Sequence, residues 1–139
     1  PRAGIERAAR MLKPGGVLLL SSANFDAWTW RWLGSSHWYL QTPQHLGVIS
    51  RRFLERVGRD RKMKLARFDA IPHRHAARRL RWREAIEVIY WGMRQRNGPP
   101  YRVSRRLLQS IPGLRDLRQM QAARWTMTLS DHVLVTYDC

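Results

Sequence analysis

Histidine is the side chain of this chain best suited to exchange protons near neutral pH, because an imidazole titrates there. The chain has five histidines, and His45 is the candidate general base for removing a proton from an oxygen or nitrogen acceptor. Pro43 stiffens the loop that presents the His45 ring, because proline fixes its own φ. The competing interpretation is a loop histidine that bonds to the backbone. His37, beside Trp38, is a poorer candidate.

Metal and disulfide chemistry are not expected. His73 and His75 stand two positions apart, but no third ligand of a suitable type lies close to them in the sequence, and solvated loop histidines explain the pair. Cys139 is the one cysteine, so neither an internal disulfide nor a cysteine-based metal site is expected, and no disulfide-linked partner. This cysteine usage fits a reducing compartment. Because no apolar run is long enough to span a membrane, we expect a cytoplasmic location.

Tryptophans gather in one short stretch of the chain. Trp28, Trp32 and Leu33 fall on nearly one side of a short helix, where core packing explains them. Trp30 is displaced by two positions and should face the other way, which makes it the better probe of a ligand or membrane contact. Together with Trp28, Trp32, Trp38 and Tyr39, it is a candidate wall of an apolar pocket for an isoprenoid, aromatic or lipid acceptor. A belt at a bilayer surface is the alternative.

Arginine dominates the formal charge of +16, because only Lys13, Lys62 and Lys64 are lysines among the 26 basic residues. Basic surfaces attract nucleic acid and anionic lipid. The alternative function is therefore a non-enzymatic basic module that binds nucleic acid or an anionic membrane surface through Arg and Trp. The arginines are scattered, a pattern that GC-rich coding also produces, and nucleic acid is the less expected partner. The arginines of residues 78–83 are candidate contacts for phosphates or headgroups, with a solvated helix entrance as the ordinary explanation.

Periodic apolar positions predict the helices. Apolar residues recur at helical spacing over residues 5–12, before Pro14 stops the helix. Ser50 predicts the start of another helix, and Gly58 predicts its end in a left-handed conformation. Further helices are predicted at 82–93, stopped by the Asn-Gly-Pro-Pro sequence at 97–100, and at 104–110.

Three segments predict strands. Residues 17–20 are apolar at successive positions, so both faces of the strand must be covered, as in the interior of a mostly parallel sheet. Further strands are predicted near 64–70 and at 132–137. Asn24 and Asp26, after the first strand, can each cap the short helix that follows. Because helices alternate with strands, we expect an α/β layer fold.

The junction of the first helix and strand resembles a known family. Residues 10–20, with the sequence RMLKPGGVLLL, are similar to the LKPGG-strand signature of class I S-adenosylmethionine-dependent methyltransferases. In that family this strand is the fifth of a seven-stranded Rossmann-like sheet. The similarity continues at residues 24–26 (the turn after the strand), 38–46 (a lid segment), 50–58 (the helix before the sixth strand) and 131–137 (the closing seventh strand).

The resemblance implies an α/β fold, namely a partial Rossmann-like methyltransferase sheet of strands five to seven with flanking helices and a helical insertion at about 75–128. Residues 1–139 would then be the C-terminal part of a single domain. The implied function is methyl transfer to a small-molecule or lipid-like acceptor, with S-adenosylmethionine as the cofactor of the full-length protein. Two positions depart from the family pattern: Ala23 replaces a proline, and Arg59 replaces an aromatic residue.

The cofactor cradle of that family is absent from this sequence. No G-x-G-x-x-G turn follows a strand, and the acidic residue that holds the ribose has no counterpart. The cofactor-binding residues are therefore unknown. We expect that a cofactor-binding half was encoded ahead of Pro1 and that this chain alone is inactive.

Ligands of open α/β sheets bind outside the carboxyl ends of the strands. The resemblance therefore places Ser22 and Asn24 at the mouth of the acceptor site, whereas the competing interpretation is that they only cap the next helix. His45 is the one histidine inside a resembling segment and is the expected catalytic residue. The expected acceptor-binding residues are Ser22, Asn24, Trp30, Trp38 and Pro43.

Overall fold

The computed structural model describes residues 1–41 and 47–138. The chain forms two compact units, which we describe separately. The sheet unit comprises Pro1–Ala27, His45–His73 and Ser130–Cys139, and the helical unit comprises Trp28–Gln44 and Arg74–Leu129. The second segment of the helical unit covers the stretch where a helical insertion is predicted. Within the described residues no helix is long and apolar enough to cross a membrane.

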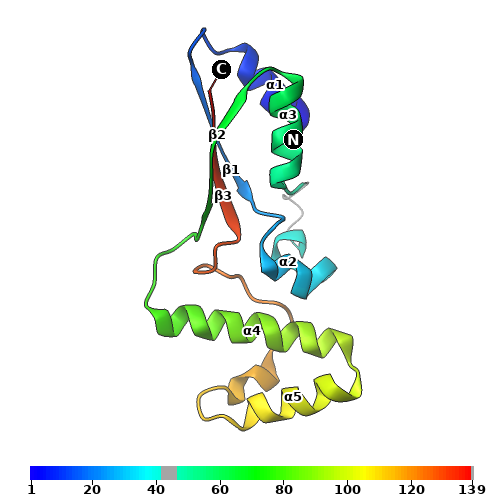
Figure 1. The fold of residues 1–139 in the computed structure, drawn as a ribbon. Helices are drawn as coiled ribbons and strands as arrows, with labels where there is room; N and C mark the ends of the chain where they lie inside the picture. The colour runs from blue at the N-terminus through cyan, green and yellow to red at the C-terminus, as the bar shows by residue number, and fades with distance from the viewer. Residues whose placement is uncertain (42–46, 139) are drawn as a thin grey trace. The chain divides into compact units, whose positions relative to one another are not determined.

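The sheet unit is built on three strands, β1 (Val17–Ala23), β2 (Lys64–Ile71) and β3 (His132–Asp138), in the order β1-β3-β2. Both neighbours pair with β3 in an antiparallel manner, so β1 and β2 run in the same direction on either side of it (Figure 1). The α/β expectation is confirmed at this level. A mostly parallel sheet is not what the described strands form, because the strand that joins the other two runs against both.

One face of the sheet carries the core of this unit. The helices α1 (Arg2–Arg10) and α3 (Arg51–Asp60) lie on the same side of the sheet (Figure 1). Tyr137 is fully buried there, its hydroxyl donates to the Leu54 carbonyl oxygen at 2.7 Å, and burial raises its pKa to about 12. The buried residues of this core are Ile5, Leu18, Ile49, Leu54, Val57, Met63, Val133, Val135 and Tyr137.

The other face of β1 is exposed. Val17 and Leu19 keep 56% and 61% of their surface accessible, whereas Leu18, which points to the helices, keeps 8%. The expectation that both faces of this strand are covered is therefore wrong for the described chain. The physical reason is that α1 and α3 cover a single face of the sheet, and that β1 pairs along one edge only, with β3.

Two side chains cap the start of α3. The Ser50 hydroxyl accepts a hydrogen bond from the Phe53 backbone N–H at 3.2 Å, which confirms the predicted start. Asp26 caps this helix as well, because its carboxylate accepts from the Arg51 N–H at 2.7 Å. Gly58 does not end the helix, contrary to prediction. It lies inside α3, and a Cβ there would stand 3.0 Å from the Met63 carbonyl oxygen.

The helical unit contains α2 (Trp28–Leu33), α4 (Arg78–Arg96) and α5 (Pro99–Ser110), with short 3₁₀ segments at Gly34–Ser36, Trp38–Gln41 and Arg115–Gln119. Asn97 ends α4 in the left-handed conformation, with φ of 46°. The two prolines after it are predicted from the sequence only as a stop signal. In the structure they form the first turn of α5, where their missing N–H groups cost no helical hydrogen bond.

Helix α4 buries a mixed face of apolar and acidic residues. Val88, Tyr90 and Met93 are buried, and Glu84 and Glu87 are buried with them. The predicted apolar face was partly wrong, because Trp82 and Ile89 on it are exposed. Where α4 and α2 meet, Gly92 allows the close approach of Trp32, whose indole nitrogen donates to the Ile89 carbonyl oxygen at 2.8 Å.

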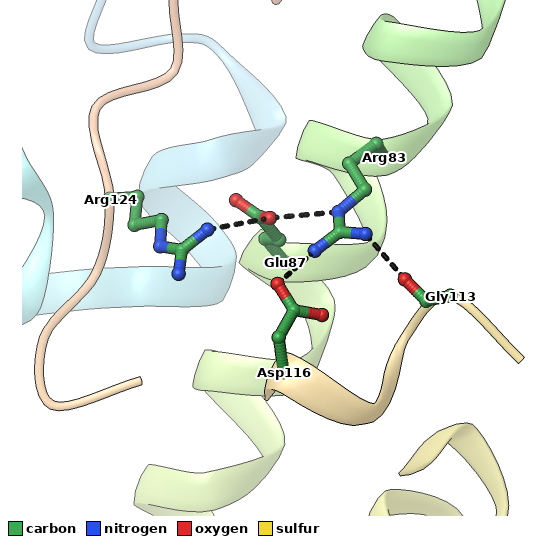
Figure 2. Close-up of polar contacts among 5 residues, drawn as sticks. All are labelled: Arg83, Glu87, Gly113, Asp116 and Arg124. Carbon is green, nitrogen blue, oxygen red and sulfur yellow. Dashed lines mark hydrogen bonds and ion pairs between the residues drawn. The ribbon is translucent and has the colours of Figure 1, made fainter. Parts of the chain in front are cut away.

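A polar network links α4 to the segments that carry Gly113, Asp116 and Arg124, as Figure 2 shows. Arg83 donates to Glu87 at 3.0 Å and also binds Asp116 and the Gly113 carbonyl oxygen. Arg124 reaches the same Glu87 oxygen at 3.2 Å. Because the hydrogen bonds that it donates to Glu87 and Asp116 stabilise its charged form, the pKa of Arg83 lies above its ordinary range. Arg83 is therefore a structural residue, unlike its neighbours at the start of the helix.

Candidate functional site

The carboxyl ends of β1 and β2 meet at one edge of the sheet. Ala23 ends β1, Ile71 ends β2, and both are register partners of His132, the first residue of β3. Both segments of the helical unit begin a few residues beyond these strand ends, after Ala27 and after His73. This is the edge at which ligands of open α/β sheets bind.

Three side chains from two segments gather at this edge. His132 Nδ1 lies 3.1 Å from an oxygen of Asp131, and the His73 ring lies against the His132 ring, with 3.5 Å between the ring centroids. Asp131 and His132 are buried, at 1% and 8% exposed, whereas His73 is exposed. A buried carboxylate thus stands behind two imidazoles, the outer of which faces solvent.

The electrostatics of the cluster favour a neutral outer histidine. Partial desolvation lowers the pKa of His73 below its ordinary value of 6.5, and repulsion from His132 lowers it further, while the Asp131 carboxylate opposes the shift. A proton on His73 would place one positive imidazole beside another ring that can also become charged. At neutral pH the His73 ring is therefore predominantly neutral.

The arrangement is suited to accepting and relaying a proton. With Nδ1 protonated, His132 donates to Asp131, and its Nε2 then carries the lone pair. A carboxylate in this position orients the imidazole and stabilises its protonated form. The pair of rings can thus take up a proton from a hydroxyl or amine held at the edge, with His73 as the outer acceptor.

The predicted residues at the end of β1 have structural contacts. Asn24 is buried. Its side-chain oxygen accepts from the Asp26 backbone N–H at 3.0 Å, and its own backbone N–H donates to the Asp131 carbonyl oxygen at 2.7 Å. Asn24 therefore holds the Asp131 backbone in place. Ser22 pairs with Val133 on the face covered by helices, opposite to the face of His132. The structure separates it from the histidine cluster.

His45, the predicted general base, and Pro43, a predicted acceptor contact, lie outside the described residues. Their roles remain predictions from the sequence. The histidines that the structure brings together are instead His73, assigned to a solvated loop in the sequence analysis, and His132, assigned only to a strand.

The two predicted tryptophan contacts belong to the interior of the helical unit. Trp30 is 6% exposed and stacks on His37 with 3.9 Å between the ring centroids. Trp38 is 3% exposed, and its indole N–H donates to the Thr126 hydroxyl at 2.8 Å. The expected packing of Trp28 in the core is wrong, since Trp28 is 43% exposed and Trp30 is the buried one. The role of Trp30 and Trp38 as acceptor contacts stays a prediction from the sequence.

The sequence does not reveal the histidine cluster, because His73 lies far from Asp131 and His132 along the chain. A usable signal was present in the adjacent Asp131 and His132 at the start of a predicted strand, an ion pair placed where a strand meets the ligand edge. His73, just past the end of another strand, completes the pattern. Among the described residues, no three histidine, cysteine or acidic side chains are grouped so that they could hold a metal ion.

Comparisons of this chain with protein-family models, with curated proteins and with solved structures found no match.

Proposed function

We propose that this chain is the acceptor-binding part of a class I S-adenosylmethionine-dependent methyltransferase that acts on a small-molecule or lipid-like acceptor. The proposal starts from the resemblance of residues 10–20 to the LKPGG-strand signature. It is supported by the positions of the strands: β1 and β3 coincide with the segments that resemble the fifth and seventh strands of that family, and β2 follows the segment that resembles the helix before the sixth. In this proposal the described sheet is part of a larger Rossmann-like sheet.

The histidine cluster is the single observation that carries the chemical part of the proposal. A hydroxyl or amine acceptor becomes a better nucleophile when a base removes its proton. His73 is exposed at the ligand edge, has a lowered pKa, and contacts His132, which is paired with Asp131. We assign His73 as the proton acceptor, and His132 with Asp131 as the pair that positions it.

The residues of this chain do not fit S-adenosylmethionine. The printed sequence has neither a Gly-rich turn after a strand nor an acidic residue at a matching strand end. The work that this chain can do is to bind and orient the acceptor and to take up its proton. Cofactor binding requires residues from outside the printed sequence.

The exposed side of β1 is where such residues would join. Its outer edge is not paired by any described strand, and Val17 and Leu19 on its uncovered face are apolar. A further parallel strand on this edge, followed by a covering helix, would bury both side chains. This accounts for apolar residues at successive positions of β1, which the described chain alone leaves half exposed.

The proposal can be tested by isothermal titration calorimetry with S-adenosylmethionine. We expect no measurable binding by the 139-residue chain and micromolar binding by the complete product of the gene from which the chain comes. A complete product that does not bind the cofactor would overturn the proposal. In the complete product, His73→Gln should lower the rate of methyl transfer without changing cofactor affinity, whereas His75→Gln serves as the matched control.

A further inference from the structure

A groove in the helical unit joins arginines to tryptophans. Arg78, Arg81, Trp82 and Ala85 recur at i, i+3, i+4 and i+7 of α4 and so form one stripe. Trp28 of α2 and Leu129 line the groove from other segments, and the groove has a volume of about 410 Å³. Two positive charges thus lie beside an apolar floor in a space of small-molecule size.

The side chains of this groove are available to a ligand. Trp82 is 69% exposed and Trp28 is 43% exposed. Arg78 and Arg81 are exposed, and among the described residues neither takes part in an ion pair. Arg83, two positions further along, provides the contrast, because Glu87 and Asp116 hold its guanidinium.

The start of α4 adds to the positive potential. Arg78 is the first residue of this 19-residue helix, whose first turn has no acidic residue and whose N-cap, Ala77, makes no side-chain hydrogen bond. The first N–H groups of a helix lack helical partners and carry the positive end of its dipole. An anion bound between Arg78 and Arg81 would therefore lie near backbone donors as well as guanidinium groups.

We propose that this groove binds a phosphate-bearing amphiphile, with the phosphate on Arg78 and Arg81 and the first part of the apolar chain between Trp28 and Trp82. Guanidinium groups bind phosphate oxygens through paired N–H donors. Indole rings combine an apolar body with a polar edge, which suits the boundary between a headgroup and its chain. The inference does not depend on the proposed methyltransferase function.

The observations favour an amphiphile over a nucleic acid strand. A strand needs an extended basic track in which charges follow the backbone. Here the run of arginines at residues 78–83 is short, because Arg83 is held by acidic partners and Glu84 and Glu87 follow on the same helix. Ala85 and Leu129 also line the groove, and their aliphatic side chains suit methylenes better than a stacked base.

The test measures the affinity of the whole chain for three probes. These are vesicles of phosphatidylcholine with phosphatidylglycerol, vesicles of phosphatidylcholine alone, and monomeric dihexanoyl phosphatidylglycerol. We expect binding to the mixed vesicles and not to pure phosphatidylcholine. Binding to the monomeric lipid as well would identify a free amphiphile as a sufficient ligand, whereas binding to the mixed vesicles alone would identify a headgroup within a bilayer.

Matched variants locate the site. Arg81→Gln should weaken binding to the mixed vesicles about fivefold, and the double variant Arg78→Gln with Arg81→Gln about 25-fold. The reason is that each arginine near an anionic surface contributes a comparable free energy of binding. Arg81→Lys should show a smaller loss, since it keeps the charge and loses the paired donors. Arg106→Gln, an exposed arginine of α5 outside the groove, is the control and should bind like the parent chain.

Two results would overturn the inference. One is an equal loss of lipid binding in Arg81→Gln and Arg106→Gln, which would indicate attraction by overall charge. The other is an unchanged affinity of the double variant for lipid together with a lost affinity for an oligouridylate, which would assign the arginines to nucleic acid. Circular dichroism of each variant checks folding. Trp82→Leu is a second variant, which keeps an apolar side chain at an exposed position. It should lower the affinity for the lipid probes and leave the affinity for the oligouridylate unchanged.

Discussion

At the residue scale, two imidazoles that lie against each other cannot both take up a proton without mutual repulsion. His73 and His132 stand in this relation, with 3.5 Å between their ring centroids, and the Asp131 carboxylate beside His132 partly offsets the repulsion. The pKa of His73 is therefore lowered by His132 and raised by Asp131, in addition to the lowering by desolvation.

The pKa of His73 is the first testable consequence. We expect a value below the ordinary 6.5. His132→Gln should raise it towards that value, because a source of repulsion is removed, whereas Asp131→Asn should lower it further, because an opposing negative charge is lost. Proton NMR titration of the imidazole resonances measures the pKa of His73 in the parent chain and in both variants. A His73 pKa that does not change in His132→Gln would contradict the coupling of the two rings.

The same shift has a consequence for stability. The unfolded chain binds the His73 proton at a higher pH than the folded chain does, because the pKa of His73 is lower in the folded state. His73 therefore lowers the folded-state stability as the pH falls below 6.5 towards the folded pKa. Urea unfolding of the parent chain and of His73→Gln across this pH range should show a smaller acid loss in the variant.

Gly58 is required by packing. In this position of α3 a Cβ would stand 3.0 Å from the Met63 carbonyl oxygen and 3.1 Å from a ring carbon of Tyr137. Both neighbours are buried, so Gly58→Ala should destabilise the chain by about 1–3 kcal/mol in urea unfolding. Gly4→Ala in α1 is the control: no atom lies within 4 Å of its Cβ, and alanine should stabilise that helix by up to about 1 kcal/mol. Equal effects at both positions would contradict the packing argument.

At the element scale, the start of α3 depends on residues from two separate segments. Ser50 accepts from the Phe53 N–H, and Asp26 accepts from the Arg51 N–H. The Asp26 bond also ties the turn after β1 to this helix. The sequence analysis assigned Asp26 to the nearer helix that follows it, because a local signal cannot reveal a partner 25 residues away.

Loss of these caps should be measurable in equilibrium unfolding. We expect Ser50→Ala to cost about 1 kcal/mol, and Asp26→Ala a similar amount, because each leaves an N–H of the first turn without its acceptor. Ser104→Ala in α5 serves as the control, since that hydroxyl only donates to the Pro100 carbonyl oxygen on the exposed helix surface. If Asp26→Ala lowers the free energy of unfolding no more than Ser104→Ala does, the Asp26 cap of α3 is not made in solution.

At the scale of the whole molecule, the exposed side of β1 and the net charge have opposite effects on the association of one chain with another. An unpaired strand edge with apolar neighbours favours pairing with another chain, and Val17 and Leu19 lie on such a strand. The formal charge of +16 favours separation of the chains. Added salt screens the repulsion between the charged chains more than it weakens an apolar contact between them.

We therefore expect the isolated chain to self-associate more strongly as the salt concentration rises. Leu19→Lys should reduce this association, because it places a charge on the uncovered face of β1, while Met11→Lys, which changes a residue that is 79% exposed outside the strands, should not. Sedimentation velocity at low and high salt measures the effect. Association of the same strength in both variants would exclude β1 as the contact.

The sequence by itself determined the local elements. Helical periodicity and capping signals located α1, α3 and most of α4, and runs of apolar and β-branched residues located all three described strands. These features could be predicted because they depend on the chemistry of neighbouring residues along the chain. The helix that begins with Pro99 and the role of Gly58 were misjudged, because both residues also act as stop signals in other contexts.

The tertiary structure decided which of these residues meet. It brought His73 to His132 across 59 positions of the chain, buried Trp30 and exposed Trp28, and placed Arg81 in a groove while Arg83 became part of an ion-pair network. Local pattern could not show this, because a contact between distant segments depends on strand order, on register and on which face of each element is covered.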